Sequence, residues 1–519
     1  MEDIKIFKKS LTERITIPAV SNEYWYGGCV MDGPQYPFSV ESGYTLEMIT
    51  LDTVNQFAPI FVSTKGRAIW SEKAFNLYSV GNNFEISATA DVYLYEGGSC
   101  LKDAQKVISK EVYTLGEMPP KEFFEMPQWN SWIELLYKQN EEDILKYAKG
   151  IIDNGFPAGI IMIDDLWADY YGRWKFSERK FPHAKELIST LHEMGFKVML
   201  WVCPFVTPDT PEYHQLRDDN MLIKNKDGKP VIREWWNGYS AVLDLSNPKT
   251  YAWLKNELMS LQDDFGVDGF KFDAGDPRFY SNDDISYMGL SALEQVELWS
   301  RFGLEFPFNE YRVNYKNQGA PLVNRLQDKE FEWGKNGLSE LIPSTLAQGM
   351  LGYYFSCPDM IGGGEYQSFL GKTELDQELI VRSAQCSALM PMMQFSVAPW
   401  RVLDQEHLDL CKAAANKHVE YSEYIIELAK NAAETGEPIV RPVAYDYPEA
   451  DLRYSNTQFM LGSKVLVAPV LEKSAQFKEV YLPSGKWKNV LNQEVLSGPT
   501  IEKIVVDLKT IPVFEKVEE

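Results

Sequence analysis

Hydrophobic and polar positions in the first 118 residues follow the pattern of short strands. Apolar, β-branched and aromatic runs such as residues 57–63 and 90–95 are separated by Gly, Asn, Asp and Pro. Runs of this length, bounded by turn-forming residues, are typical of all-β structure. We therefore expect residues 1–118 to form an N-terminal β-sandwich.

The pattern changes after residues 116–120, Gly-Glu-Met-Pro-Pro. Strand-like apolar runs now alternate with amphipathic segments such as residues 141–154 and 183–194. Eight runs have this character: residues 129–132, 158–164, 197–203, 269–273, 307–312, 321–327, 352–357 and 391–395. Eight buried strands separated by helices predict an α/β fold, a (β/α)8 TIM barrel, over residues 119–436.

The last segment, residues 437–519, returns to short strands joined by turns such as residues 482–486, Leu-Pro-Ser-Gly-Lys. This predicts a small C-terminal β-sandwich domain. Three domains agree with the length of 519 residues, which exceeds what one hydrophobic core usually serves.

Charge and composition narrow the class of partner. The chain has 51 Lys and Arg against 75 Asp and Glu, a formal net charge of −24, whereas nucleic-acid sites need clustered positive charge. It has no apolar run of about 18 residues and no apolar core near its start. We expect no nucleic-acid and no membrane partner, and leave a homo-oligomer open. As the sequence stands it indicates a cytoplasmic protein, or a periplasmic or secreted one if a signal peptide was removed.

Cysteines and histidines give no sign of a metal or cofactor. The six cysteines are dispersed without a C-x-x-C pair, and none of the five histidines falls in a catalytic-looking motif. We therefore expect neither a metal site nor a bound cofactor, and a metal-dependent barrel enzyme is disfavoured.

Acidic and basic residues gather at the C-terminal ends of the predicted strands, where barrel enzymes place their chemistry. Asp273 ends the fourth strand, and Lys271, two residues earlier, faces the same side of it. The ammonium can keep the carboxylate ionised for nucleophilic attack and bind a sugar hydroxyl; a structural ion pair is the alternative. Asp328 ends the sixth strand, where either a general acid or a surface aspartate is compatible with the sequence.

Three motifs together resemble family 31 of the glycoside hydrolases. They are residues 270–275, Phe-Lys-Phe-Asp-Ala-Gly; residues 325–328, Arg-Leu-Gln-Asp, followed by Trp333-Gly; and residues 358–363, Pro-Asp-Met-Ile-Gly-Gly. These motifs are most similar to those of the myogenesis-regulating glycosidase branch, an α-galactosidase-like group. The resemblance extends from the predicted sandwich to the C-terminal strands.

The resemblance implies a retaining exo-α-glycoside hydrolase that acts on an α-linked oligosaccharide or glycoside. Asp273 would be the nucleophile that forms a covalent glycosyl-enzyme, and Asp328 the acid/base. Arg312 would contact the sugar and the surroundings of the nucleophile. Asp164 would accept hydrogen bonds from hydroxyls around C4 and C6, while Asp165 should point away from it if the strand continues. Asp359, before the Ile-Gly-Gly turn, would have an architectural role.

Aromatic residues offer stacking surfaces for the apolar face of a sugar. Trp132 is one candidate, and Trp236 resembles the loop tryptophan that lies against the axial O4 in the α-galactosidase-like branch. Many α-glucosidases of the family carry a histidine near the end of the eighth strand, where Phe395 stands in this chain. These two features favour an α-galactosidase over an α-glucosidase or α-xylosidase. A catalytically inactive carbohydrate-binding homologue is a further alternative.

Overall fold

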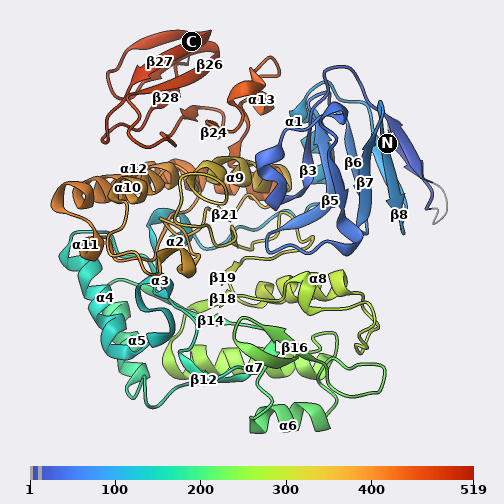
Figure 1. Ribbon diagram of the computed structural model, residues 1–519, viewed down its shortest axis with the longest axis vertical. Coiled ribbons are helices and arrows are strands. Elements are labelled where there is room, and N and C mark those ends of the chain that lie inside the picture. The colour runs from blue at the N-terminus through green and yellow to red at the C-terminus, as the bar shows by residue number, and fades with distance from the viewer. Residues whose placement is uncertain (1–3, 10–13, 519) are drawn as a thin grey trace.

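The computed structural model describes residues 4–9 and 14–518, in which a β-sandwich, a barrel and a C-terminal sheet follow one another (Figure 1). The sandwich consists of two antiparallel sheets, whose aromatic side chains meet between them; the Trp25 and Phe84 rings, for example, are 5.8 Å apart. The strand orders are β1 (Ile4–Phe7), β9 (Val92–Tyr95), β6 (Ala68–Ser71), β5 (Phe57–Ser63) and β3 (Trp25–Cys29) in one sheet, and β2 (Ile15–Pro18), β8 (Asn83–Ala88), β7 (Phe75–Val80) and β4 (Thr45–Glu47) in the other.

Eight parallel strands of the described chain form the barrel, so the predicted fold class is confirmed. In spatial order they are β10 (Gln128–Asn130), β11 (Ile160–Ile163), β14 (Lys197–Val202), β18 (Gly269–Phe272), β19 (Phe308–Tyr311), β20 (Asn324–Arg325), β21 (Ser356–Cys357) and β22 (Gln394–Phe395). β22 pairs with β10, and a parallel bridge from Met360 to Gln394 joins the segment after β21 to β22. The ring of strands is thereby closed.

Helices follow the strands and cover the barrel. Their ends carry the expected signals: the Asn140 side chain accepts a hydrogen bond from the backbone of Asp143 at the start of α4, and Gly436, with a φ of 75°, ends α12. The longer helices are α1 (Leu101–Val112), α4 (Glu141–Asp153), α5 (Ala184–Glu193), α6 (Pro211–Asp218), α7 (Pro248–Phe265), α8 (Ala292–Phe302), α9 (Leu341–Met350), α10 (Gln377–Ser387) and α12 (Gln405–Thr435). The shorter elements are α2 (Glu122–Glu125), α3 (Trp132–Leu135), α11 (Pro399–Val402) and α13 (Val443–Asp446), with the hairpin strands β12 (Ala168–Tyr170), β13 (Arg173–Phe176), β15 (Phe205–Val206), β16 (Ile232–Trp235) and β17 (Gly238–Val242).

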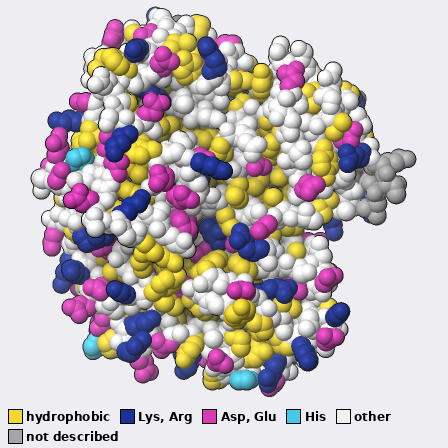
Figure 2. Space-filling view, in the orientation of Figure 1, with side chains coloured by type: hydrophobic (Ala, Val, Ile, Leu, Met, Phe, Trp, Pro, Cys, Tyr) yellow, Lys and Arg dark blue, Asp and Glu magenta, His cyan; other side chains and the backbone are white. Residues whose placement is uncertain are grey.

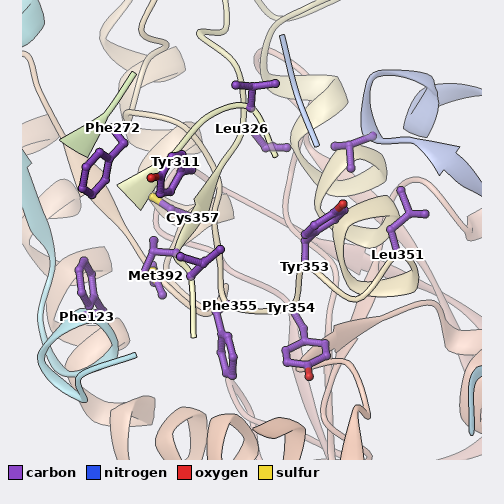
Figure 3. Close-up of a cluster of buried hydrophobic side chains, with 14 of the residues drawn as sticks. Phe123, Phe272, Tyr311, Leu326, Leu351, Tyr353, Tyr354, Phe355, Cys357 and Met392 are labelled. Carbon is purple, nitrogen blue, oxygen red and sulfur yellow. The ribbon is translucent and has the colours of Figure 1, made fainter. Parts of the chain in front are cut away.

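Alternation along the barrel strands separates an apolar layer from a polar interior. Phe272 and Tyr311, on neighbouring strands, stack with their ring centroids 4.8 Å apart in the apolar cluster drawn in Figure 3. Glu310, one residue before Tyr311, instead reaches across the barrel and accepts a hydrogen bond from Gln394 of β22. The same period of two turns Lys271 and then Asp273 towards the barrel axis.

The C-terminal region is an antiparallel sheet that packs above α12 (Figure 1). Tyr421 of α12 donates a hydrogen bond to Glu515 of this sheet. Its strand order is β23 (Val440–Arg441), β24 (Phe459–Leu461), β25 (Val465–Val467), β28 (Val513–Lys516), β26 (Phe477–Asn489) and β27 (Val495–Val505). A small C-terminal β-domain is therefore present, but its described strands form one six-stranded sheet and not the two sheets of the predicted sandwich.

On the face shown in Figure 2, Lys and Arg side chains are interspersed with Asp and Glu, without an extended patch of one sign. None of the helices within residues 4–9 and 14–518 combines the length and the apolar composition needed to cross a membrane.

Candidate active site

A cavity of about 540 Å³ opens at the C-terminal ends of the barrel strands. It is lined by all seven residues predicted for the site: Trp132, Asp164, Trp236, Lys271, Asp273, Arg312 and Asp328. A larger hollow of about 1060 Å³ lies between the sandwich and the segment around α8, but it contains none of them. We therefore place the candidate active site in the smaller cavity, where the barrel concentrates charged side chains.

Asp273 directly follows β18, and the backbone turns sharply after it. Ala274 and Gly275 both have positive φ, and a Cβ on Gly275 would lie 2.2 Å from the Trp299 ring, so only glycine fits there. The Asp273 carboxylate accepts hydrogen bonds from Arg312 Nε at 3.1 Å and from Trp201 Nε1 at 2.9 Å. These contacts hold both carboxylate oxygens in fixed positions.

The charges around Asp273 keep its carboxylate ionised. Burial by itself raises the pKa, but the charges of Arg312, Lys271 and Arg325 and the hydrogen bond from Trp201 outweigh burial and lower the pKa of Asp273 well below its usual value. An ionised carboxylate is the form that a nucleophile requires.

Lys271 pairs with Asp164 and not with Asp273. Its ammonium lies 2.6 Å from Asp164 Oδ2, and both side chains are buried. The backbone N–H of Asp164 donates to Ser131 Oγ, which ties this carboxylate to the loop after β10. The alternative of a Lys271–Asp273 ion pair is therefore wrong, although the charge of Lys271 still contributes to the low pKa of Asp273.

Asp165 does not point away from the site, contrary to the expectation. β11 ends at Ile163, so the alternation of a strand no longer applies, and Asp165 lines the cavity beside Asp164. Its carboxylate accepts hydrogen bonds from Tyr171 Oη at 3.1 Å and from Asn237 Nδ2 at 2.5 Å. Burial and the neighbouring Asp164 charge raise the pKa of Asp165 to about 7.

Asp328 and Asp359 both bind one nitrogen of a buried arginine. Arg325 Nη1 is 2.8 Å from Asp328 Oδ1 and 2.6 Å from Asp359 Oδ1. Asp328 is the more accessible carboxylate, with 39% of its side chain exposed against 14% for Asp273. Asp359 is buried and also accepts hydrogen bonds from the backbone of Lys329 and Gly364, contacts that agree with the predicted architectural role.

The two predicted tryptophans lie in different parts of the cavity wall. Trp236, in the turn between β16 and β17, is 47% exposed, and the Arg312 guanidinium carbon lies 5.6 Å from its ring centroid. Trp132 begins α3 instead of continuing the first strand, because Asn130 Oδ1 accepts a hydrogen bond from its backbone N–H. Trp201 of β14 also lines the cavity and donates a hydrogen bond to Asp273.

Phe395 does not occupy a sugar-contacting position. It is fully buried and stacks on Trp129 with the ring centroids 4.8 Å apart, outside the cavity. In the two-residue strand β22 it is Gln394 that faces the barrel interior. The expected replacement of a histidine by Phe395 at the sugar is therefore wrong, and no histidine lines the cavity within the described part of the chain.

The sandwich also supports the site, a role that no sequence pattern had indicated. Gln56 Nε2 donates to the carbonyl oxygen of Arg325 at 2.8 Å and to that of Arg312, while Asn55 Oδ1 accepts from the backbone of Gln327 at 2.7 Å. These partners are more than 250 residues apart in the chain, so no local pattern could have found them. The described residues contain no group of three or more His, Cys, Asp or Glu arranged to hold a metal ion.

Comparisons with known proteins assign the barrel and the C-terminal domain of the chain to one family. Residues 116–323 match the model "Glycosyl hydrolases family 31 TIM-barrel domain" and residues 436–518 the model "Glycosyl hydrolase family 31 C-terminal domain", together more than half of the chain.

Two curated relatives and one solved structure extend these matches. The myogenesis-regulating glycosidase of Mus musculus is 35% identical over 409 residues, 76% of this chain and 56% of the relative. Alpha-glucosidase 2 of Bacillus thermoamyloliquefaciens is 25% identical over 513 residues, 90% of this chain and 62% of the relative. The chain thus spans less than two thirds of the length of either. The family 31 dextranase of Flavobacterium johnsoniae, solved with glucose, superimposes with a TM-score of 0.85 at 20% identity, covering 98% of this chain and 68% of that one, which shows the shared fold.

Proposed function

The chain belongs to family 31 of the glycosyl hydrolases, and from this premise we propose that it is a retaining exo-α-glycoside hydrolase, with α-galactosides as its substrates. The observation that carries the proposal is the environment of Asp273. Its carboxylate is bound by Arg312 and Trp201 and kept ionised at the wall of a cavity that also contains Asp328.

The reaction proceeds in two displacements. Asp273 attacks the anomeric carbon, the bond to the leaving oxygen breaks, and Asp328 gives that oxygen its proton. A glycosyl-enzyme results, in which the sugar is bonded to an Asp273 oxygen. Asp328, now a carboxylate, removes a proton from water, which attacks the same carbon and releases Asp273. The exposure of Asp328 supports this exchange because the proton-transfer group must meet both the leaving group and water.

Buried polar groups beside Asp273 support the binding of one sugar ring. The Asp164 carboxylate and the Lys271 ammonium form a fixed acceptor and donor for neighbouring hydroxyls, and Arg312 adds a second cation. A site whose buried groups fix one sugar ring in this way favours action on the end of a chain.

Galactose as the terminal sugar is supported by Trp236 and by the resemblance to the α-galactosidase-like branch. The half-exposed ring of Trp236 stands next to Arg312, where it can cover the side of a sugar that carries an axial hydroxyl. An α-glucosidase or α-xylosidase on the same carboxylates is the second candidate, favoured by the relative that is named an alpha-glucosidase. A binding protein without turnover is the third.

A panel of p-nitrophenyl α- and β-glycosides tests the proposal. We expect nitrophenol release from the α-galactoside and none from the β-glycosides, and a loss of about 10⁴-fold or more in kcat for Asp273→Ala. Asp264→Ala, at an exposed aspartate on α7, is the matched control and should keep full activity. Cleavage of the α-glucoside or α-xyloside alone would replace the galactoside assignment. Activity that survives in Asp273→Ala would refute the mechanism, and sugar binding without turnover by the wild type would favour the binding protein.

A further inference from the structure

Two hairpin turns meet at one buried carboxylate in the cavity wall, that of Asp165. Tyr171 lies in the turn between β12 and β13, and Asn237 lies in the turn between β16 and β17. Tyr171 Oη donates a hydrogen bond to Asp165 Oδ1 at 3.1 Å. Asn237 Nδ2 lies 2.5 Å from Asp165 Oδ2 and 2.7 Å from Tyr171 Oη, so the three side chains bind one another.

The main chain of Asp165 binds a second group of the site. Its backbone N–H donates to Asp164 Oδ1 at 2.8 Å, while the Lys271 ammonium binds Asp164 Oδ2. Asp165 thus contacts the Asp164 carboxylate through its backbone and the two hairpin turns through its side chain. One residue therefore connects Asp164 to the β16–β17 turn.

The β16–β17 turn carries Trp236, the residue directly before Asn237. Trp235 and Gly238 pair with each other at the ends of the two strands, so the ladder fixes the backbone on either side of the turn. The Trp235 ring also packs against the Tyr171 ring, with a centroid distance of 4.7 Å. Trp236 is 47% exposed and lines the cavity. Its orientation over the cavity therefore depends on how the turn itself is held, and the side chain of Asn237 bonds that turn to the barrel.

The choice of a carboxylate at position 165 needs an explanation beyond packing. Asp165 is 2% exposed, and both side chains that bind it are neutral. Burying a carboxyl group among neutral donors costs free energy, whereas an apolar side chain of similar size would pack at this place at a lower cost. A carboxylate does supply two acceptor oxygens, one for each hairpin turn, and bonds to an ionised acceptor are the stronger ones.

We propose that Asp165 is a positioning residue, which through Asn237 and Tyr171 fixes the Trp236 ring relative to the Asp164 carboxylate and thereby sets the selectivity between sugars that differ at C4. The inference rests on the proposed function, which places Asp164 and Trp236 at the hydroxyls of the terminal sugar. A change in the spacing of these two groups alters how an axial and an equatorial hydroxyl fit, and contacts of this kind are worth about tenfold or more in selectivity.

The kinetic test compares the glycoside that the panel selects with its C4 epimer, which for the α-galactoside is the α-glucoside. Asn237→Leu keeps the approximate shape of the side chain but donates no hydrogen bond. We expect it to lower kcat/KM for the selected glycoside about tenfold, mainly through KM, and to lower that for the epimer less. Asp165→Leu should have the same effect, whereas Asp165→Asn keeps an acceptor and should retain most of the selectivity. Asn256→Leu, at an exposed asparagine on α7, is the matched control and should change neither rate.

A double-mutant cycle tests whether the two residues act through each other. Because each single variant removes the same bond, Asp165→Leu combined with Asn237→Leu should lose no more selectivity than the worse single variant. A purely structural role would lower thermal stability and reduce both rates equally. Equal losses on the two epimers, losses confined to kcat, independent effects in the double variant, or no loss in the single variants would overturn the proposal.

A second measurement needs no turnover. In protein labelled with 5-fluorotryptophan, the fluorine resonance of Trp236 is assigned by its loss in Trp236→Phe. We expect this resonance to move in Asp165→Leu, a position remote from Trp236 in the chain, and to stay in place in Asn256→Leu. If the wild type cleaves no α-glycoside, the proposed function fails, and the resonance alone then judges the network. An unchanged Trp236 resonance in Asp165→Leu would overturn the positioning role.

Discussion

The two sides of the cavity are built on different principles. The charged wall, Asp164, Lys271, Asp273 and Arg312, comes from β11, β18 and β19, and no side chain in it is more than 14% exposed. The aromatic wall, Trp132, Tyr137 and Tyr366, comes from loops after β10 and β21, and Tyr137 is 37% exposed.

The difference lies in how firmly each wall is held. Every member of the charged wall has an ion-pair or hydrogen-bond partner within the cavity, whereas the side chains of the aromatic wall are held by ring contacts and by neutral hydrogen bonds such as that of Trp132 to Gly364. A wall of fixed charges suits one sugar ring in one orientation, because a displaced charge in a buried site loses its partner. A wall of partly exposed rings tolerates different ligands, because stacking depends little on which hydroxyls a sugar carries. Asp328, 39% exposed, stands between the two.

Removing the acid/base should give the largest effect, and one that depends on the leaving group. Asp328→Asn keeps the shape of the side chain but cannot give up a proton. We expect kcat/KM for an α-linked disaccharide to fall about 10²- to 10⁴-fold, with a much smaller loss for the glycosyl fluoride, which needs no proton to leave. Steady-state rates on the two substrates measure the difference. Equal losses on both substrates would mean that Asp328, like the charged wall, acts on the terminal sugar and not on the leaving group.

Breaking the buried ion pair of Lys271 and Asp164 in the charged wall should destabilise the folded protein. Lys271→Met leaves the Asp164 carboxylate buried without a cation, which we expect to lower the free energy of unfolding by about 3–5 kcal/mol, measured by urea denaturation. Lys197→Met is the control on β14, where the lysine is 43% exposed and pairs with Asp268, and should cost about 1 kcal/mol or less. A similar small loss in both variants would show that the charged wall does not depend on this pair.

The pH dependence of stability should report on Asp165. Its folded pKa of about 7 lies above the ordinary aspartate value of 3.8, so the native state holds this proton more tightly than the unfolded chain does. The stabilisation is fully present below about pH 4 and is lost as pH rises through 7. Asp165→Asn cannot titrate there, so the unfolding free energy of the wild type relative to the variant should fall by roughly 1–3 kcal/mol between pH 5 and pH 8. Urea midpoints at the two pH values measure this, with Asp264→Asn as the exposed control; parallel curves for wild type and Asp165→Asn would contradict the assignment.

Most of the barrel and many of the site residues were predictable, because the information is local. Apolar runs alternating with amphipathic segments predicted all eight strands, and Lys271 and Asp273 face inward because they lie two residues apart on one strand. The errors arose where strands end. The prediction for Asp165 continued the strand pattern past Ile163, whereas the Asp165 side chain binds Asn237. The prediction for Phe395 matched a motif across the two-residue strand β22, whereas the Phe395 ring stacks on Trp129. In both cases the contact comes from a segment far away in sequence.

The sequence by itself determined the order of domains, the barrel and the two carboxylates, since the period of hydrophobic positions and the composition of short motifs are properties of neighbouring residues. Only the tertiary structure decided which charges pair, because Lys271 is 107 residues from Asp164 and several strands carry carboxylates that could have been its partner. It also decided that Asn55 and Gln56 of the sandwich support the site, and that Trp132 is anchored to Gly364 beside Asp328. Contacts of this kind depend on how the barrel closes, which no stretch of sequence specifies alone.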